Sequence, residues 1–216
     1  MSLNAYSLQA IGLIMKDKYY IKVYRLVTIV LVSLFAFSAC NTIHGNGKIV
    51  NSNRTVNDFT GIMITGAANV NINFSNSYNV NIRTDSNVQD YLTTSVDSNG
   101  ALAIGTSGKS LSFVTLEIEI TMPKLKNISV NGAAKIKLGS GNGESLHIEV
   151  SGTGDIDTTN YQVNNVKCII NGAGTVKVWS MKTLDCTING LGTLYYKGNP
   201  NIQKSINGIG SIRSLI

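Results

Sequence analysis

The sequence predicts an all-β fold: a single-domain parallel β-helix, a solenoid with roughly 18–20 residues per coil, and an irregular N-terminal β cap. Three observations lead to this prediction. Glycines recur at a nearly constant interval, and apolar residues occupy matching positions around them. Glycine is abundant, with 21 residues, whereas only 14% of residues are charged and only 2 are proline. Few charges together with many Asn, Ser, Thr and Gly favour short strands and tight turns over amphipathic helices.

The repeat lies in the C-terminal half of the chain. Five glycines each close an apolar–x–apolar–x–Gly phrase, at intervals of 20, 20, 18 and 18 residues: Gly132, Gly152, Gly172, Gly190 and Gly208. Two residues before them stand Val130, Val150, Ile170, Ile188 and Ile206, and four residues after them stand Ile136, Ile156, Val176, Leu194 and Ile212. Alternation within a phrase predicts strands with one buried face, and matching positions across phrases predict that these strands stack in register.

The residues at the turn of each phrase have an expected role. Glycine suits a corner that requires a positive φ. An Asn precedes most of these glycines and is expected to form a hydrogen-bonded ladder along the stack, through Asn131, Asn171, Asn189 and Asn207. In the last phrase Lys204 replaces a buried apolar residue, which predicts a polar terminal coil that prevents edge-to-edge growth. A right-handed coil is favoured, whereas the 18-residue spacing leaves a left-handed one possible.

The N-terminal segment has the pattern of an export signal. Basic residues are followed by an uncharged apolar run from Leu26 to Ala39, so residues 1–39 are predicted to be a signal peptide, with Met15 as a possible true start. The ending Phe37–Cys40 matches a bacterial lipobox except for Phe37, where an aliphatic residue is usual. Cys40 is therefore the expected lipid attachment site, and an ordinary signal peptide or an uncleaved anchor is the alternative. Residues 41–216 are predicted to form one β-helical domain.

A family resemblance follows from the order of several short motifs. Phe59–Ile62, then Ile118–Leu125, then the serial Asn-Gly phrases resemble the autotransporter adhesin, head GIN domain family of bacterial lipoproteins. The resemblance covers essentially all of residues 45–216. It implies a β-helical fold similar to pectin-lyase-type and hexapeptide acyltransferase folds, and a role in adhesion. No catalytic residue carries over from this family.

The candidate binding face is an outward column of the expected stack. Asp155 and Asp157 project from one face of a strand, beside lysines of the preceding coil. Solvated cross-strand charge pairs are the ordinary interpretation, and a Ca²⁺-dependent lyase-type site is the alternative. Flat faces with exposed aromatic and polar side chains also suit glycans. The predicted binding face comprises Lys137, Asp155, Asp157, Lys177, Trp179, Tyr195 and Arg213.

The remaining candidate residues are cysteines and histidines. Cys168 and Cys186 occupy one buried column in adjacent coils, which permits either a disulfide or stacked thiols. The chain has 2 histidines, His44 in the expected tether and His147 on an outward position. This distribution argues against hexapeptide acyl transfer, which needs a histidine as general base.

These patterns predict a non-enzymatic, lipid-anchored protein of the bacterial cell envelope, at the outer membrane, and the family resemblance implies that it acts in surface adhesion, through a glycan or a surface protein. No cofactor or metal is expected. Loss of the signal segment removes four positive charges and one negative charge and lowers the net charge from +6 to +3, which does not favour nucleic acid. The alternatives are a polysaccharide lyase-like enzyme and a structural envelope protein that self-associates as a homo-oligomer.

Overall fold

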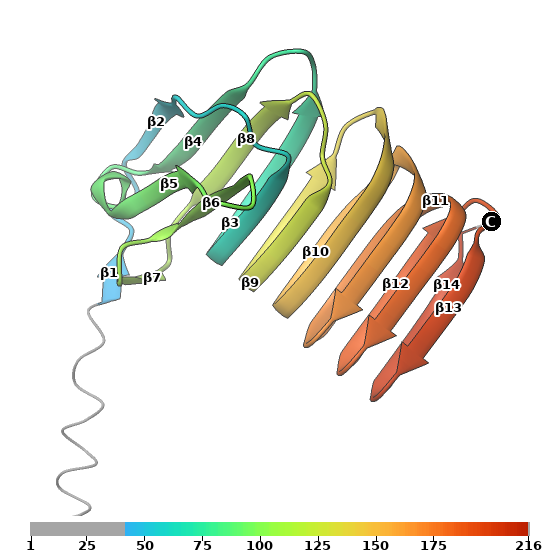
Figure 1. The fold of residues 1–216 in the computed structure, drawn as a ribbon. Coiled ribbons are helices and arrows are strands. Elements are labelled where there is room, and N and C mark those ends of the chain that lie inside the picture. The colour runs from blue at the N-terminus through green and yellow to red at the C-terminus, as the bar shows by residue number, and fades with distance from the viewer. Residues whose placement is uncertain (1–41, 216) are drawn as a thin grey trace, which may run out of the picture. The chain divides into compact units, whose positions relative to one another are not determined.

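The computed structural model describes residues 42–215, and these residues are all-β, as predicted. The expected signal peptide, Met15 and Cys40 lie outside the described residues. The elements are β1 (Thr42–His44), β2 (Ile49–Arg54), β3 (Gly61–Phe74), β4 (Asn79–Asp85), the short 3₁₀ helix η1 (Gln89–Tyr91), β5 (Leu92–Val96), β6 (Ala101–Thr106), β7 (Ser110–Ser112), β8 (Leu116–Met122), β9 (Asn127–Leu138), β10 (Gly141–Ile170), β11 (Ala173–Ile188), β12 (Leu191–Lys197), β13 (Asn201–Ile206) and β14 (Ile209–Ser214) (Figure 1). Between residues 42 and 215, no helix has the length and apolarity needed to span a membrane.

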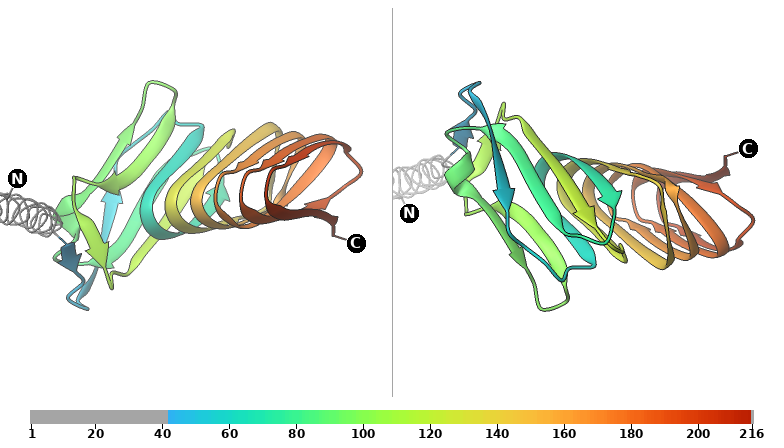
Figure 2. Two further views of the ribbon diagram at one scale, coloured as in Figure 1. Left: turned by 90° about the horizontal axis from the view of Figure 1, so that it is seen from below. Right: turned by 90° about the horizontal axis from the view of Figure 1, so that it is seen from above.

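The C-terminal strands form a parallel stack whose order follows the chain. β9, β10, β11, β12 and β14 pair in sequence, all parallel, and β13 pairs with another part of β11 (Figures 1 and 2). The register places Ile136 beside Ile156, Ile156 beside Val176, and Leu194 beside Ile212. The predicted apolar columns are therefore confirmed.

The N-terminal half joins this stack through β3. β3 pairs in parallel with β9, so Gly66 lies beside Gly132 and Val70 beside Ile136. β8 and β6 pair in parallel with β3, whereas β2–β4, β4–β8 and β5–β6 are antiparallel. Among the described strands, antiparallel pairing is confined to this N-terminal region, which agrees with the predicted irregularity.

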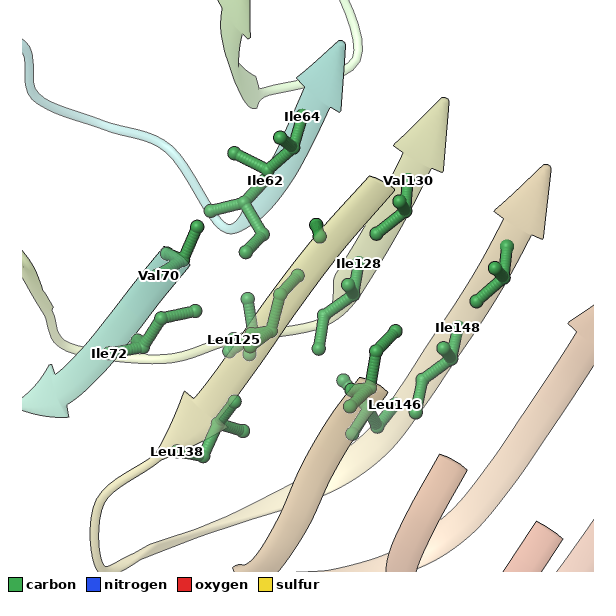
Figure 3. Close-up of a cluster of buried hydrophobic side chains, with 14 of the residues drawn as sticks. Ile62, Ile64, Val70, Ile72, Leu125, Ile128, Val130, Leu138, Leu146 and Ile148 are labelled. Atoms are coloured by element: carbon green, nitrogen blue, oxygen red, sulfur yellow. The ribbon is translucent and has the colours of Figure 1, made fainter. Parts of the chain in front are cut away.

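The core consists of aliphatic side chains on the inward positions of successive strands. Ile62, Ile64, Ile128, Val130 and Ile148 are 0–1% exposed, and Figure 3 shows them packed together in neighbouring strands. Burial of this apolar surface is the main stabilising contribution, at about 25 cal/mol per Å² removed from water. Outward residues alternate with these core residues along each strand.

Glycine is required in the C-terminal part of the glycine column for a reason that differs from the predicted one. Gly132 and Gly152 do adopt positive φ values, of 145° and 141°. Gly172, Gly190 and Gly208 do not, so the prediction is wrong for these three. A Cβ atom on any of them would instead collide with the backbone carbonyl of the preceding glycine in the column. The column excludes side chains because adjacent backbones approach too closely.

The predicted Asn ladder forms over three of its four members. Asn189 Nδ2 donates to Asn171 Oδ1 over 2.7 Å, and Asn207 Nδ2 donates to Asn189 Oδ1 over 3.0 Å. Asn131 is separated from this ladder by Ser151, its register partner, because residue 151 is not Asn. The amide ladder is therefore a property of the last three phrases.

The terminal strands are only partly polar. Lys204 lies beside Cys186 and is exposed, as predicted, but Ile206 is 38% exposed and Ile209 is 80% exposed. The expectation of a polar terminal coil is therefore wrong for these two isoleucines. Their side chains lie at the end of the strand order, where no further described strand covers them.

Gly190→Ala tests the steric origin of the glycine column. Because the new methyl group would collide with the Gly172 carbonyl, we expect the free energy of unfolding to fall by about 2–3 kcal/mol. Gly100→Ala is the control, since Gly100 has a φ of 73° with nothing near its Cβ position, and should cost about 1–2 kcal/mol through backbone strain alone. Chemical denaturation measures both values. A Gly190→Ala cost no larger than that of Gly100→Ala would contradict the steric explanation.

Candidate functional site

Five outward residues of the predicted binding face form one continuous row, here named the outer ladder: Lys137, Asp157, Lys177, Tyr195 and Arg213. Each is the register partner of the next, across β9, β10, β11, β12 and β14. Their neighbours along the strands are core residues such as Ile136, Ile156 and Val176, so parity places the ladder side chains on the outer surface. Lys137 and Arg213 are exposed, and the other three are half-buried.

Asp157 is the most constrained member of the outer ladder. The Thr159 backbone N–H and the Thr159 hydroxyl both donate to Asp157 Oδ1, over 3.0 and 2.6 Å. Partial burial raises the pKa of Asp157, but the Thr159 hydrogen bonds and the charges of Lys177 and Lys137 outweigh it, so the pKa is lowered. Asp157 is therefore an ionised carboxylate between two cations at neutral pH.

Asp155 lies in the adjacent outward row, not in the outer ladder. Its Oδ2 atom is 3.9 Å from Lys135 Nζ, and its partner on the other side is Thr175. Asp155 and Lys135 border an open depression of about 680 Å³ whose floor contains small residues such as Gly154. Among residues 42–215, no three His, Cys, Asp or Glu side chains gather closely enough to hold a metal ion. The two aspartates are arranged as members of cross-strand charge pairs.

Trp179 extends the candidate face at the end of the part of β11 that pairs with β12. It is half-buried, beside the buried Val178, and its register partner is Lys197. The Lys197 Nζ atom lies 4.0 Å from the Trp179 ring centroid, which is the geometry of a cation–π contact. This contact covers one region of the indole and adds a cation to the predicted face.

A second candidate surface was missed by the sequence analysis. A groove of about 1190 Å³ runs along another part of the repeat, with Lys124, Lys126, His147 and Lys167 among its lining residues. Glu144 organises it by accepting hydrogen bonds from the side-chain amides at positions 164 and 165, over 2.8 and 3.4 Å. The adjacent Asn164 and Asn165 were the available signal, but their meaning depends on Glu144, which another part of the chain brings beside them.

The cysteines and His147 take the positions that parity predicted, whereas His44, which was expected in a tether, lies in β1 opposite Ser112. Cys168 and Cys186 are register partners, and both are buried as free thiols. A disulfide between them stays a prediction. A hydrogen bond with Cys186 and burial raise the pKa of the Cys168 thiol. His147 lines the groove, and the His44 ring lies beside the Phe113 ring in a tilted arrangement, with ring centroids 6.2 Å apart. The two histidines are on separate surfaces.

Thr159→Ala tests the electrostatics of the outer ladder. Alanine keeps the backbone N–H donor and lacks only the hydroxyl, which donates to Asp157 Oδ1 over 2.6 Å. Because this hydroxyl hydrogen bond favours the charged form, its removal should raise the pKa of Asp157 and lower the free energy of unfolding by about 0.5–1 kcal/mol at pH 7. A carboxyl group whose pKa is lower in the folded than in the unfolded protein stabilises the fold at pH values above its unfolded pKa, about 3.9. This stabilisation is lost as the pH falls through the folded pKa.

Urea denaturation between pH 7 and pH 2, with a carboxyl NMR titration, measures this effect. Thr153→Ala, at an exposed position of the same strand, is the matched control. If the free energies of unfolding of wild type and Thr159→Ala differ by the same amount over the whole pH range, the Thr159 hydroxyl does not act through the charge of Asp157.

Comparisons with known proteins agree with this fold. The family model described as "Putative auto-transporter adhesin, head GIN domain" matches residues 58–140 and 132–200. A solved "putative adhesin" from Bacteroides fragilis is 20% identical, covers 80% of this chain and 100% of its own, and has a TM-score of 0.54. A "putative adhesin" from Parabacteroides distasonis is 19% identical over 81% of this chain and 100% of its own (TM-score 0.42). No curated protein matches the chain.

The structure match and the family match support different conclusions. At 20% identity the Bacteroides fragilis structure is evidence for the fold alone. The family model spans residues 58–200, which is more than half of the chain and includes both the N-terminal strands and most of the parallel stack. An adhesin family indicates a cell-surface or envelope protein. The chain therefore belongs to the auto-transporter adhesin, head GIN domain family.

Proposed function

We propose that this protein is an exported lipoprotein, anchored through Cys40 in the outer membrane, whose parallel β-helix binds an acidic glycan or an acidic surface protein at the outer ladder. Its action is adhesion without catalysis, and no cofactor is required. The resemblance of the first forty residues to a lipoprotein signal supports the anchor. In-register parallel pairing, with offsets of 20 and then 18 residues, supports the β-helix.

The observation that carries the binding proposal is the spacing of cations in the outer ladder. Lys137, Lys177 and Arg213 occupy every second strand, with Asp157 and Tyr195 between them. Because strands lie about 4.8 Å apart, the cations repeat at about 10 Å. This spacing is comparable to a disaccharide unit of an extended polysaccharide, so one acidic group per unit could pair with each cation. Tyr195 offers an aromatic surface for sugar stacking.

The combined variant Lys137→Ala/Lys177→Ala/Arg213→Ala should lose acidic-glycan binding. Three exposed charge pairs contribute about 0.5–1 kcal/mol each, so we expect the Kd for polygalacturonate to rise at least about tenfold. Wild-type binding should weaken with salt, and a neutral dextran should not bind. Isothermal titration calorimetry measures the affinities.

The matched control is Lys124→Ala/Lys126→Ala/Lys167→Ala, which removes the same charge from the groove. If the outer-ladder variant binds the glycan as the wild type does and the control variant loses binding, the glycan site is the groove and not the outer ladder. Depolymerisation of polygalacturonate that Asp155→Ala abolishes would favour the lyase-like alternative instead. Concentration-dependent self-association without glycan binding would favour the structural envelope protein.

Surface display has a separate test. If the protein acts in adhesion, a non-permeant protease added to intact cells should remove it while a periplasmic protein survives, as immunoblots would show. Protection of this chain until the cells are lysed would exclude adhesion and favour a periplasmic role.

A further inference from the structure

The most exposed large apolar side chain of the described region lies beside the point where the chain enters it. Phe113 is 92% exposed, and it directly follows β7. β7 pairs in parallel with β1, so that Thr42 lies opposite Ser110 and His44 opposite Ser112. Thr42 is the first described residue, and Asn41 alone separates it from Cys40 in the sequence.

The neighbouring segments hold Phe113 in its exposed position, and its backbone is strained there. Its φ is 52°, in the left-handed region that bulky residues rarely adopt. The Gly45 N–H donates to the Ser112 carbonyl over 3.2 Å on one side of Phe113, and the Thr115 N–H donates to Asp85 Oδ2 over 2.9 Å on the other. Strained conformations that the surrounding structure imposes occur mainly at functional sites.

Asp85 ties this loop to the entering chain. It is 2% exposed, and its second oxygen, Oδ1, accepts the Gly47 N–H over 2.6 Å. One buried carboxylate therefore holds the 45–47 segment and the 113–115 segment together. The position of Phe113 is therefore fixed by a backbone–backbone hydrogen bond on one side and by a hydrogen bond to the Asp85 carboxylate on the other.

Covalent reach limits how far this surface can lie from an anchor at Cys40. An extended chain spans at most about 3.6 Å per residue, so Thr42 lies within about 7 Å of the Cys40 Cα atom and His44 within about 14 Å. The headgroup layer of one leaflet is itself about 5–8 Å thick. An acylated Cys40 therefore keeps the β1–β7 pair at the membrane surface, whatever the orientation of the remaining strands.

We propose that the β1–β7 edge docks on the bilayer that anchors the chain, with the Phe113 ring inserted among the lipid headgroups. This inference rests on the proposed lipid anchor. Phenylalanine is a typical apolar residue of membrane-interface segments. Lys109, which precedes β7 beside the entry point, supplies a positive charge that anionic lipid attracts. Docking at this edge fixes the orientation of the outer ladder relative to the membrane.

The test uses the full chain, purified from membranes and reconstituted into anionic vesicles with brominated acyl chains, which quench a membrane-embedded indole. Trp179→Phe removes the single tryptophan of the sequence, and Phe113→Trp then introduces a probe at the proposed contact. Ile209→Trp in the same background is the matched control, because position 209 is 80% exposed on β14. Flotation of the vesicles reports the anchor independently.

We expect the probe at position 113 to be blue-shifted and quenched several-fold more strongly than the probe at position 209. If the chain floats with the vesicles but the probe at 113 stays unquenched, docking is wrong and the lipid anchor stands. If the chain does not float with the vesicles, the proposed lipid anchor is wrong, and the docking proposal, which rests on it, is wrong too. Shielding of position 113 without vesicles, increasing with protein concentration, would assign this surface to a second copy and overturn membrane docking.

Discussion

The close approach of successive backbones in the glycine column is the constraint on which the rest of the parallel stack depends. At Gly172, Gly190 and Gly208 no Cβ atom fits against the carbonyl of the preceding glycine, so the strands reach this close approach only in a register that keeps glycine in the column. Because side chains alternate along a strand, a slip by one residue would turn every core residue outward. The column therefore fixes the register that buries Ile136, Ile156 and Val176.

The same register determines the outer surface. Once core positions are aligned, the residues between them are aligned too, and this is why cations of the outer ladder recur on every second strand. A repeated surface of this kind suits a ligand that is itself repetitive, such as a polysaccharide. The lowered pKa of Asp157 keeps its carboxylate charged between Lys137 and Lys177, so at neutral pH the ladder carries three cations, separated first by a carboxylate and then by the uncharged Tyr195.

The two ends of the strand order differ physically. Around β3, antiparallel strands and the buried Asp85 carboxylate tie several distant segments together, including the segment next to Cys40 in the sequence. At β13 and β14, Ile206 and Ile209 are exposed. The two ends of the described strand order therefore differ in how their apolar side chains are covered.

The sequence alone determined the all-β class, the strand parity and the columns of the outer ladder, because a fixed period with alternating apolar residues admits one consistent register. It also identified the family, through the order of short motifs. Tertiary structure decided what depends on contacts between distant segments. The close approach of neighbouring backbones explains why Gly190 is glycine, the groove at Glu144 joins separate strands, and Asp85 fixes the segment that carries the exposed Phe113. None of these follows from local spacing, because each requires atoms that the chain brings together only on folding.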